Sequence, residues 1–317
     1  MKPAEARELA DAIRAAVGTA VVGRTEVLDT ILTGIVADGH LLIEDLPGLG
    51  KTLMARSFAS ALGLGFQRIQ FTADLLPHDI TGSEVLDPTK GEFHFRPGPV
   101  FANVLLADEI NRAPPKVQSA LLEAMQEYQV TSERSTYPLP KPFLVLATEN
   151  PLELEGTYPL PEAQVDRFLL RLRVGYPTPE EERGILERRR ARKEEQVSVP
   201  ATTTLDRFQE LQRSVEEVEL EPSVAGYVVD LVRATRADPR VEVGSSPRGS
   251  LAIQKVARAR ALLAGRDFVL PDDVKAVALP ALAHRILVKP EPWIRGVRGE
   301  DVVRAAVDRT AVPKVGY

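Results

Sequence analysis

The sequence contains no cysteine, only three asparagines, and few aromatic residues, which make up 5% of its 317 residues. Without cysteine the chain can form no disulfide, no thiolate metal site and no cysteine nucleophile. It also lacks an excess of positive charge, because 40 lysines and arginines are outnumbered by 45 aspartates and glutamates. A net charge of −5 does not favour binding to nucleic acid or to an anionic membrane.

Long hydrophobic runs are also missing. No uninterrupted apolar stretch approaches the ~20 residues that a bilayer requires, and the charged segment 1–17 has no apolar core of a signal peptide. We therefore expect a cytoplasmic protein with no membrane insertion. A hydrophobic content of 44% indicates a folded core, and 317 residues are enough for two domains.

The first half of the chain alternates short apolar runs with helical patterns. This alternation predicts an α/β fold, a parallel sheet with helices on both faces. Strands are expected at residues 41–44, 66–71, 104–107, 143–147 and 168–173. Helices are expected from residue 51 and over residues 115–128, where apolar residues recur at helical spacing. Near-continuous apolar runs are typical of strands buried on both faces.

Two stretches of this half are longer than ordinary connections. Residues 74–99 contain a turn sequence at 88–91, followed by Phe93 and Phe95 in alternation, which predicts a β-hairpin. Residues 128–142 indicate a second hairpin. Insertions that project from a core are usually functional surfaces.

A change of pattern near residue 176 predicts a boundary between two domains, 1–176 and 177–317. Thr178, Pro179 and Glu181 form a capping box that starts a helix. No alternating strand follows, so we expect a small all-helical lid domain. Its helices are expected at residues 179–195, 204–217, 222–236, 247–264, 271–285 and 299–309. The basic run 188–193 in the first helix is interpreted as a solvated helix face rather than a polyanion site.

The strongest functional signal lies between the first strand and the helix that follows it. Residues 44–52 read Glu-Asp-Leu-Pro-Gly-Leu-Gly-Lys-Thr, and the glycines let backbone N–H groups point into a concavity that holds phosphates. Lys51 would contact the β- and γ-phosphates, and the Thr52 hydroxyl would bind Mg²⁺. The general pattern has glycine six residues before the lysine, where this chain has Asp45. The expected nucleotide-binding residues here are Asp45, Leu46, Pro47, Gly48, Leu49, Gly50, Lys51, Thr52 and Leu53.

Hydrolysis needs a second, acidic site, which Asp108 and Glu109 can supply. They follow a buried strand and would emerge at its C-terminal end, where α/β sheets bind ligands. Asp108 is expected to hold Mg²⁺ through water, and Glu109 to polarise the attacking water. An ordinary acidic strand exit is the alternative, which the phosphate loop earlier in the chain disfavours.

Other features distinguish between the branches of phosphate-loop proteins. The Asn-Lys-x-Asp segment with which GTPases read guanine is absent from the sequence. Asn150 ends the fourth expected strand, beside the γ-phosphate. Arg167 precedes the fifth strand, where a neighbouring subunit's site could receive its guanidinium, although a salt bridge to Asp166 or Glu162 is the alternative. The pattern favours a ring ATPase.

These residues resemble the MoxR family of AAA+ ATPases over nearly the whole chain. The similar segments stand in family order at residues 71–82, 108–116, 147–151, 155–164 and 246–248. The resemblance implies an AAA+ core with strand order 5-1-4-3-2, followed by a helical lid. It also implies a homo-hexameric ring that hydrolyses ATP with Mg²⁺.

The resemblance also assigns roles by position. Lys51 and Glu109 are implied as catalytic residues, with Asn150 as sensor 1 and Arg167 as the arginine finger. Val22 and Gly23 match the segment that lines the adenine pocket. Glu149 stands where glutamine is more usual, which leaves its role open.

Arg248 matches the family's sensor 2 and has separate physical support. Ser246 can cap a helix that Pro247 opens, and Arg248 lies in its first turn. From a lid that closes over the core, this arginine would reach the γ-phosphate and also bind the nucleotide. A surface arginine is the alternative.

Proteins of this kind act as chaperone-like remodelers in protein maturation or in metal-cofactor insertion, often with a partner that carries a von Willebrand factor A-type domain. The resemblance therefore implies a protein client. A magnesium-chelatase-type motor subunit and a nucleic-acid-associated AAA+ ATPase are alternatives. Against the second, residues 1–176 carry 16 lysines and arginines but 23 aspartates and glutamates. A nucleotide-switched scaffold without turnover is disfavoured by Glu109.

Overall fold

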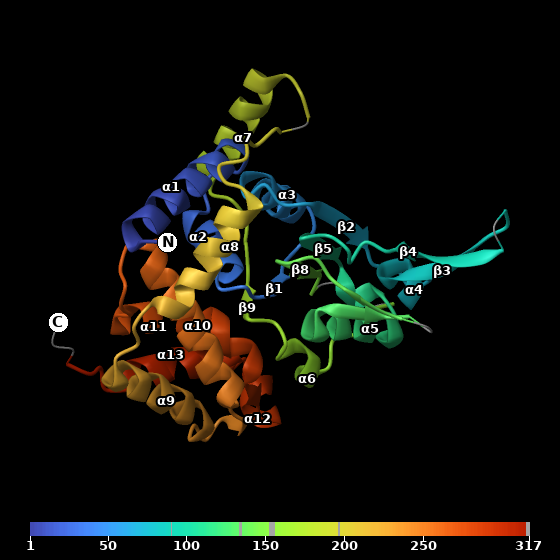
Figure 1. The fold of residues 1–317 in the computed structure, drawn as a ribbon. Coiled ribbons are helices and arrows are strands. Elements are labelled where there is room, and N and C mark those ends of the chain that lie inside the picture. The colour runs from blue at the N-terminus through green and yellow to red at the C-terminus, as the bar shows by residue number, and fades with distance from the viewer. Residues whose placement is uncertain (90, 133–134, 152–155, 196, 315–317) are drawn as a thin grey trace.

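The computed structural model describes residues 1–89, 91–132, 135–151, 156–195 and 197–314. Two helices, α1 (Pro3–Ala20) and α2 (Thr25–Val36), lead into a parallel sheet (Figure 1). Its strands are β1 (Leu41–Glu44), β2 (Phe66–Gln70), β5 (Val104–Asp108), β8 (Leu144–Glu149) and β9 (Leu170–Leu172). They lie in the order β2-β5-β8-β1-β9, which confirms the expected 5-1-4-3-2 arrangement of the five core strands.

Alternate residues of the strands face two separate cores. In β1, Leu41 and Ile43 belong to the first core and Leu42 belongs to the second. The first core includes side chains of α1, α2 and α3 (Lys51–Ala61) together with the C-terminal helices. The second includes side chains of α5 (Pro115–Glu127). The sheet is thus buried on both faces, as its apolar runs predicted.

Both expected hairpins are present. The first, β3 (Gly82–Asp87) with β4 (Glu92–Pro97), follows the short helix α4 (Pro77–Thr81) and projects away from the sheet (Figure 1). The second pairs β6 (Gln129–Thr131) with β7 (Thr136–Pro138). Residues 90 and 133–134 of the expected turns lie outside the described residues. The Phe95 and Tyr137 rings stack with centroids 3.9 Å apart, so the two hairpins contact each other.

The second half of the chain is mainly helical, as expected. After the short α6 (Glu162–Val165), its helices are α7 (Pro179–Arg192), α8 (Leu205–Ser214), α9 (Pro222–Arg236), α10 (Pro247–Leu263), α11 (Pro271–Leu282), α12 (Pro290–Ile294) and α13 (Gly299–Arg309). This half also contains the short 3-10 helices η2 (Val215–Glu217) and η3 (Ala283–Arg285), and a further one, η1 (Ile110–Arg112), follows β5 in the first half. The expectation of no strand was wrong in one detail, because β10 (Val241–Val243) pairs with β11 (Leu287–Val288). Strands this short carry no readable alternation.

The capping box that starts α7 is confirmed. The backbone N–H of Glu181 donates to Thr178 Oγ1 at 3.3 Å, and the backbone N–H of Thr178 donates to Glu181 Oε2 at 2.9 Å. A division of the chain at residue 176 stays a prediction, because the first core continues from α1–α3 into α10 and α11. In the described part of the chain, every helix is too short or too polar to cross a membrane.

Candidate nucleotide-binding site

The loop between β1 and α3 has the conformation of a phosphate cradle. Gly48 and Gly50 have φ of +81° and +80°, a region in which other residues are strained. Apart from each glycine and its two chain neighbours, no atom of the described residues lies within 4 Å of where a Cβ would stand at either position, so the loop is open on that side. Gly50 is the N-cap of α3, and no side chain caps this helix. Its first N–H groups are therefore available to an anion.

Lys51 is buried at the start of α3 and folds back over the loop. Its Nζ donates to the carbonyl oxygens of Asp45 at 2.6 Å and Leu46 at 3.1 Å. Burial lowers the pKa of its ammonium, while the negative charges of Asp108, Asp45 and Glu109 oppose that change. An ammonium has three donors, and the loop carbonyls use two of them. The third donor of the Lys51 ammonium is thus available to a phosphate oxygen while the other two keep their hydrogen bonds to the loop.

Asp45 connects the loop to the end of β9. Its Oδ2 accepts hydrogen bonds from the backbone N–H groups of Val174 at 2.6 Å and Gly175 at 2.5 Å. Its Oδ1 accepts from the backbone N–H of Leu46 at 2.8 Å. The carboxylate that replaces the general glycine therefore binds the phosphate loop to the segment leading into α7.

Asp108 lies at the C-terminal end of β5, as expected. Its Oδ1 accepts a hydrogen bond from Thr148 Oγ1 at 2.6 Å. Its Oδ2 accepts from Arg68 Nη2 at 2.7 Å. We did not anticipate Arg68, which comes from the neighbouring edge strand β2. Polar residues at three of the five positions of this strand were the available signal.

Glu109 follows Asp108 in a left-handed conformation, with φ of +56°. Its Oε2 accepts hydrogen bonds from Gln70 Nε2 at 2.7 Å and from Arg112 Nη1 at 3.2 Å. Its backbone N–H donates to Thr148 Oγ1 at 2.8 Å. Both acidic side chains are therefore bound to protein partners, and both of these side-chain contacts of Glu109 go to the same oxygen, Oε2.

The donor set fits magnesium held by a nucleotide. No group of three or more His, Asp or Glu side chains gathers into a metal site within the described residues. Mg²⁺ usually takes only one or two protein oxygens and fills its remaining positions with phosphates and water. Thr52 in the first turn of α3 and Asp108 at the end of β5 are the residues that would hold it.

Strand order places Asn150 between the acidic pair and the phosphate loop. It follows β8, which lies between β5 and β1. Asn150 is 3% exposed, and its carbonyl oxygen accepts a hydrogen bond from Asn111 Nδ2 at 3.2 Å. The structure thus brings Asn150 to the same edge of the sheet as Lys51 and Asp108.

Glu149, whose role the sequence left open, lies beside Glu44 on the neighbouring strand. Burial and the Glu44 charge raise the pKa of Glu149 to about 7, while Arg171 acts in the opposite direction. The Glu149 carbonyl oxygen accepts a hydrogen bond from the backbone N–H of Asp45 at 3.1 Å. The backbone of Glu149, whose carboxyl is partly protonated near neutral pH, is therefore hydrogen-bonded to the phosphate loop.

Arg167 and Arg248 lie at the opposite, amino edge of the sheet. Arg248 Nη1 contacts Asp166 Oδ2 at 3.3 Å, and Arg285 Nε contacts Asp166 Oδ1 at 3.0 Å. All three arginines line one pocket of about 310 Å³ together with Lys255. The structure therefore brings Arg248 beside Arg167, not to the phosphate loop of its own chain, because α10 starts next to the segment preceding β9.

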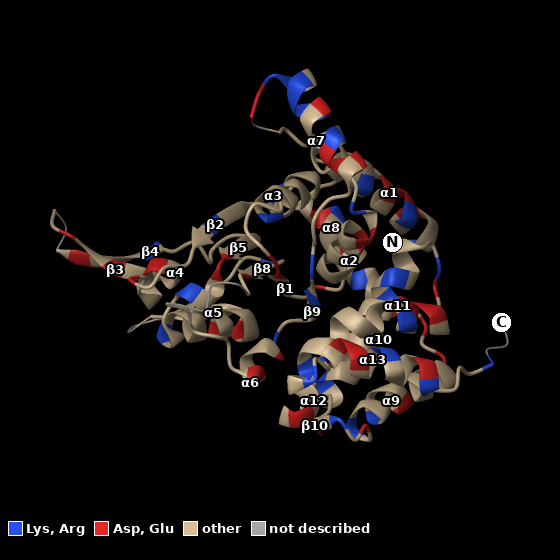
Figure 2. Cartoon of the chain, turned by 180° about the vertical axis from the view of Figure 1, so that it is seen from behind, with Lys and Arg blue, Asp and Glu red and all other residues tan. Residues whose placement is uncertain are grey.

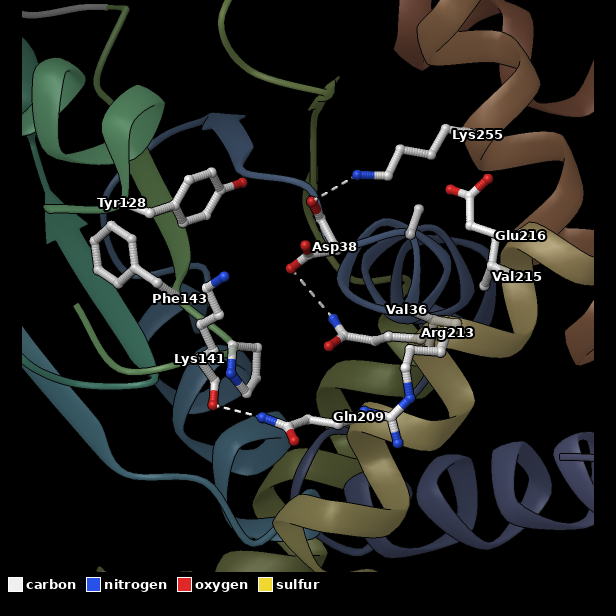
Figure 3. Close-up of a pocket in the computed structure, with 13 residues that line it drawn as sticks. Val36, Asp38, Tyr128, Lys141, Phe143, Gln209, Arg213, Val215, Glu216 and Lys255 are labelled. Atoms are coloured by element: carbon white, nitrogen blue, oxygen red, sulfur yellow. Dashed lines mark hydrogen bonds between the residues drawn. The ribbon is translucent and has the colours of Figure 1, made fainter. Parts of the chain in front are cut away.

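A second pocket of about 540 Å³ continues from this one along the seam between the core and the C-terminal helices (Figure 3). Lys255 Nζ donates to the Asp38 carbonyl oxygen at 3.1 Å. Gln209 Nε2 donates to the Lys141 carbonyl oxygen at 2.8 Å. The expected nucleotide-binding residues do not line this pocket. Its polar side chains instead connect the two halves of the chain.

A pocket of about 300 Å³ adjoins the phosphate loop. Its lining brings together expected residues from both ends of the nucleotide site, namely Val22, Gly48, Leu49, Gly50 and Leu53. It also includes three arginines of α7, at positions 188, 189 and 192. The basic run is largely exposed, as expected, yet part of it also faces the candidate site.

The fold and this site define the class of protein. A parallel sheet of order 5-1-4-3-2, a glycine loop that leads to an uncapped helix, and an acidic pair after the third core strand are the features of a phosphate-loop ATPase of the AAA+ class. Residues 40–170 match the ATPase family associated with various cellular activities (AAA), and residues 233–306 match the AAA lid domain.

Individual relatives define the family. The chain is 47% identical over 293 residues to the protein YeaC of Bacillus subtilis, covering 92% of this chain and 91% of YeaC. It is 44% identical over 304 residues to the chaperone MoxR1 of Mycobacterium tuberculosis, covering 93% and 80%. The solved structure of a candidate ATPase from Cytophaga hutchinsonii superposes with a TM-score of 0.92 at 40% identity, covering 98% of this chain and 97% of that one. The chain belongs to the MoxR family of AAA+ ATPases.

Proposed function

We propose that this protein is a Mg²⁺-dependent ATPase that works as a homo-hexameric ring and remodels client proteins. The observation that carries the proposal is the distribution of chemistry over the sheet. The phosphate loop and the acidic pair lie at the carboxyl edge, whereas Arg167 and Arg248 lie at the amino edge. One chain therefore carries two complementary parts of a hydrolytic site at opposite edges.

At the carboxyl edge, the chain's own groups would bind and orient ATP. The N–H groups of residues 48–52 hold the phosphates, and Lys51 binds the terminal ones. Mg²⁺, held by Thr52 and Asp108, supplies positive charge against the phosphate oxygens. Glu109 accepts a hydrogen bond from the attacking water and orients it toward the γ-phosphate, while Asn150 positions that water from the next strand.

At the amino edge, Arg167 would enter the site of the neighbouring subunit. A guanidinium keeps its charge and stabilises the charge that develops on the transferred phosphoryl group. Arg248 shares the pocket of Arg167, so we assign it to the same neighbouring site and not to its own. Asp166 would hold Arg248 in place until the neighbour's nucleotide competes for it.

The work performed on the client follows from family membership. The relative named chaperone MoxR1 supports a chaperone-like remodeler over a chelatase motor subunit or a nucleic-acid motor. The two contacting hairpins, β3–β4 and β6–β7, project from the core and are proposed to transmit nucleotide state to a protein client. A partner with a von Willebrand factor A-type domain, and a role in protein maturation or metal-cofactor insertion, belong to the same proposal.

The concentration dependence of steady-state ATP hydrolysis tests the proposal. We expect the rate per subunit to rise with protein concentration and then saturate as rings form, and to vanish when EDTA removes Mg²⁺. Size-exclusion chromatography at the same concentrations should show the larger species over the same range. Hydrolysis by a species that remains monomeric at every concentration would contradict the ring.

A further inference from the structure

Helix α7 has no core to hold it in place. None of its 14 residues is buried, and three of its arginines lie in its last turn. The helix projects beside α1, and its basic residues gather toward its outer end (Figures 1 and 2). An isolated helix of this length is marginal in water, so its contacts with the rest of the chain determine its position.

The first half of α7 packs on the segment expected to line the adenine pocket. Glu181 Oε1 accepts a hydrogen bond from the backbone N–H of Arg24 at 3.0 Å. A Cβ at Gly23 would overlap the Glu181 carboxylate, and one at Gly184 would lie 3.2 Å from Val22 Cγ1. A side chain at position 23 would displace the Glu181 carboxylate, and φ of +66° also favours glycine there. The start of α7 and the adenine segment form one unit.

The arginines of the second half differ in their partners. Arg188 Nη1 donates to the carbonyl oxygens of Gly18 at 2.5 Å and Thr19 at 3.2 Å, at the end of α1. Arg192 Nε donates to the Glu194 carbonyl oxygen at 2.8 Å. The Arg189 guanidinium has no hydrogen bond or ion pair with the described residues, although Arg189 lines the pocket beside the phosphate loop.

Arg24 lines the same pocket and has an unsatisfied donor. Its Nη1 is buried and has no hydrogen-bond partner within the described structure. Leaving a buried donor without a partner is unfavourable, and a ligand in this pocket could accept its hydrogen bond. The unpaired Arg24 Nη1 is an observation independent of Arg189.

The remaining lining of this pocket suits a nucleobase. Apolar side chains from three separate elements form its wall, namely Val21, Val22, Leu53, Met54 and Ile185. Gly48–Gly50 marks the side where the phosphates begin. Flat bases bind between apolar side chains, and guanidinium planes stack on their faces. We infer that Arg189 and Arg24 bind the nucleoside end of ATP, which makes α7 part of the nucleotide site. This inference rests on the proposed function, because it requires ATP in this pocket.

Comparing ATP with inorganic triphosphate tests the inference. In calorimetric titrations of the full chain with Mg²⁺, Arg189→Ala should weaken ATP binding roughly tenfold and leave triphosphate binding unchanged. Arg24→Ala should act in the same direction. Arg190→Ala is the matched control, because Arg190 belongs to the same run but does not line the pocket. Melting temperatures would show that the variants are folded.

The possible outcomes separate this inference from the proposal on which it rests. Equal losses of ATP and triphosphate affinity in Arg189→Ala would place the guanidinium on the phosphates and overturn the nucleoside assignment. Identical behaviour of Arg189→Ala and Arg190→Ala would remove α7 from the site. A wild-type chain that binds neither ligand would instead contradict the ATPase function itself.

Discussion

The two edges of the central sheet differ in the sign of the charge they present. At the carboxyl edge, the negative charges of Asp108, Asp45 and Glu109 act on the buried Lys51. At the amino edge, Asp166 is in contact with Arg248 and Arg285, and Arg167 lies in the same pocket. Parallel strands make this separation possible, because all their carboxyl ends meet on one side.

The edges also differ in how completely their charges are paired. Asp108 and Glu109 are each bound by a cation from the same chain. At the other edge one carboxylate contacts two guanidiniums, which leaves positive charge in excess. This excess of arginine charge supports the proposal that Arg167 and Arg248 act on the ATP of a second copy.

The largest effect on nucleotide binding is expected at Lys51. Lys51→Ala should lower the affinity for Mg-ATP by roughly a hundredfold or more, because the phosphate chain loses its main cation. Calorimetric titration measures this affinity. Among the described residues, the hydrogen bonds of the Nζ go to carbonyls of its own loop, so the melting temperature should change little. Normal ATP binding by this variant would refute the assignment of the loop.

Arg167 tests whether the amino edge acts on a neighbour. Arg167→Ala should lower kcat roughly a thousandfold while ATP affinity is retained. Mixing this variant with Lys51→Ala should restore part of the activity, because Lys51→Ala subunits offer Arg167 to intact phosphate loops. A chain with both substitutions is the control and should restore nothing. Absence of complementation in subunit-exchanged rings would mean that Arg167 does not act between subunits.

Glu109 tests the carboxyl edge without changing nucleotide binding. Glu109→Gln keeps an acceptor for Gln70 and Arg112 but loses the charge that polarises water, so kcat should fall roughly a hundredfold. ATP should still bind, and the ATP-loaded ring should accumulate on a sizing column. Rapid turnover by Glu109→Gln would mean that another residue positions the water.

Local patterns in the sequence predicted most of the fold, and they predicted where the phosphate loop and the acidic pair lie in it. The five strands followed from apolar runs, and the phosphate loop and acidic pair are each contiguous in sequence. The bridge from Asp45 to Val174, and the meeting of Arg248 with Asp166, join residues far apart in the chain. Such contacts depend on how helices pack and leave no periodic trace. A helix that is polar all round shows no preferred face, so the sequence does not indicate that arginines of α7 line the pocket beside the phosphate loop.

The smallest effect is expected at Glu149, as a dependence of stability on pH. Its pKa is raised to about 7 in the folded protein, from a reference value of 4.5, chiefly by burial and by Glu44, with Arg171 opposing. Between these values the folded state binds more protons than the unfolded state, so this group destabilises the fold as pH rises. The full change is at most about 3 kcal/mol.

Glu149→Gln removes this titration, because an amide stays neutral throughout. The variant and the wild type should have similar melting temperatures near pH 4.5. The variant should then become increasingly the more stable of the two up to about pH 7, with a constant difference above it. Glu44→Gln is the matched control, since it removes the neighbouring charge and should shift the change in the wild-type curve to lower pH. If the difference in melting temperature between Glu149→Gln and wild type does not vary with pH, burial at this edge leaves the pKa of the Glu149 carboxyl unchanged. The contrast between the two edges would then rest on Asp108, Glu109 and the arginines alone.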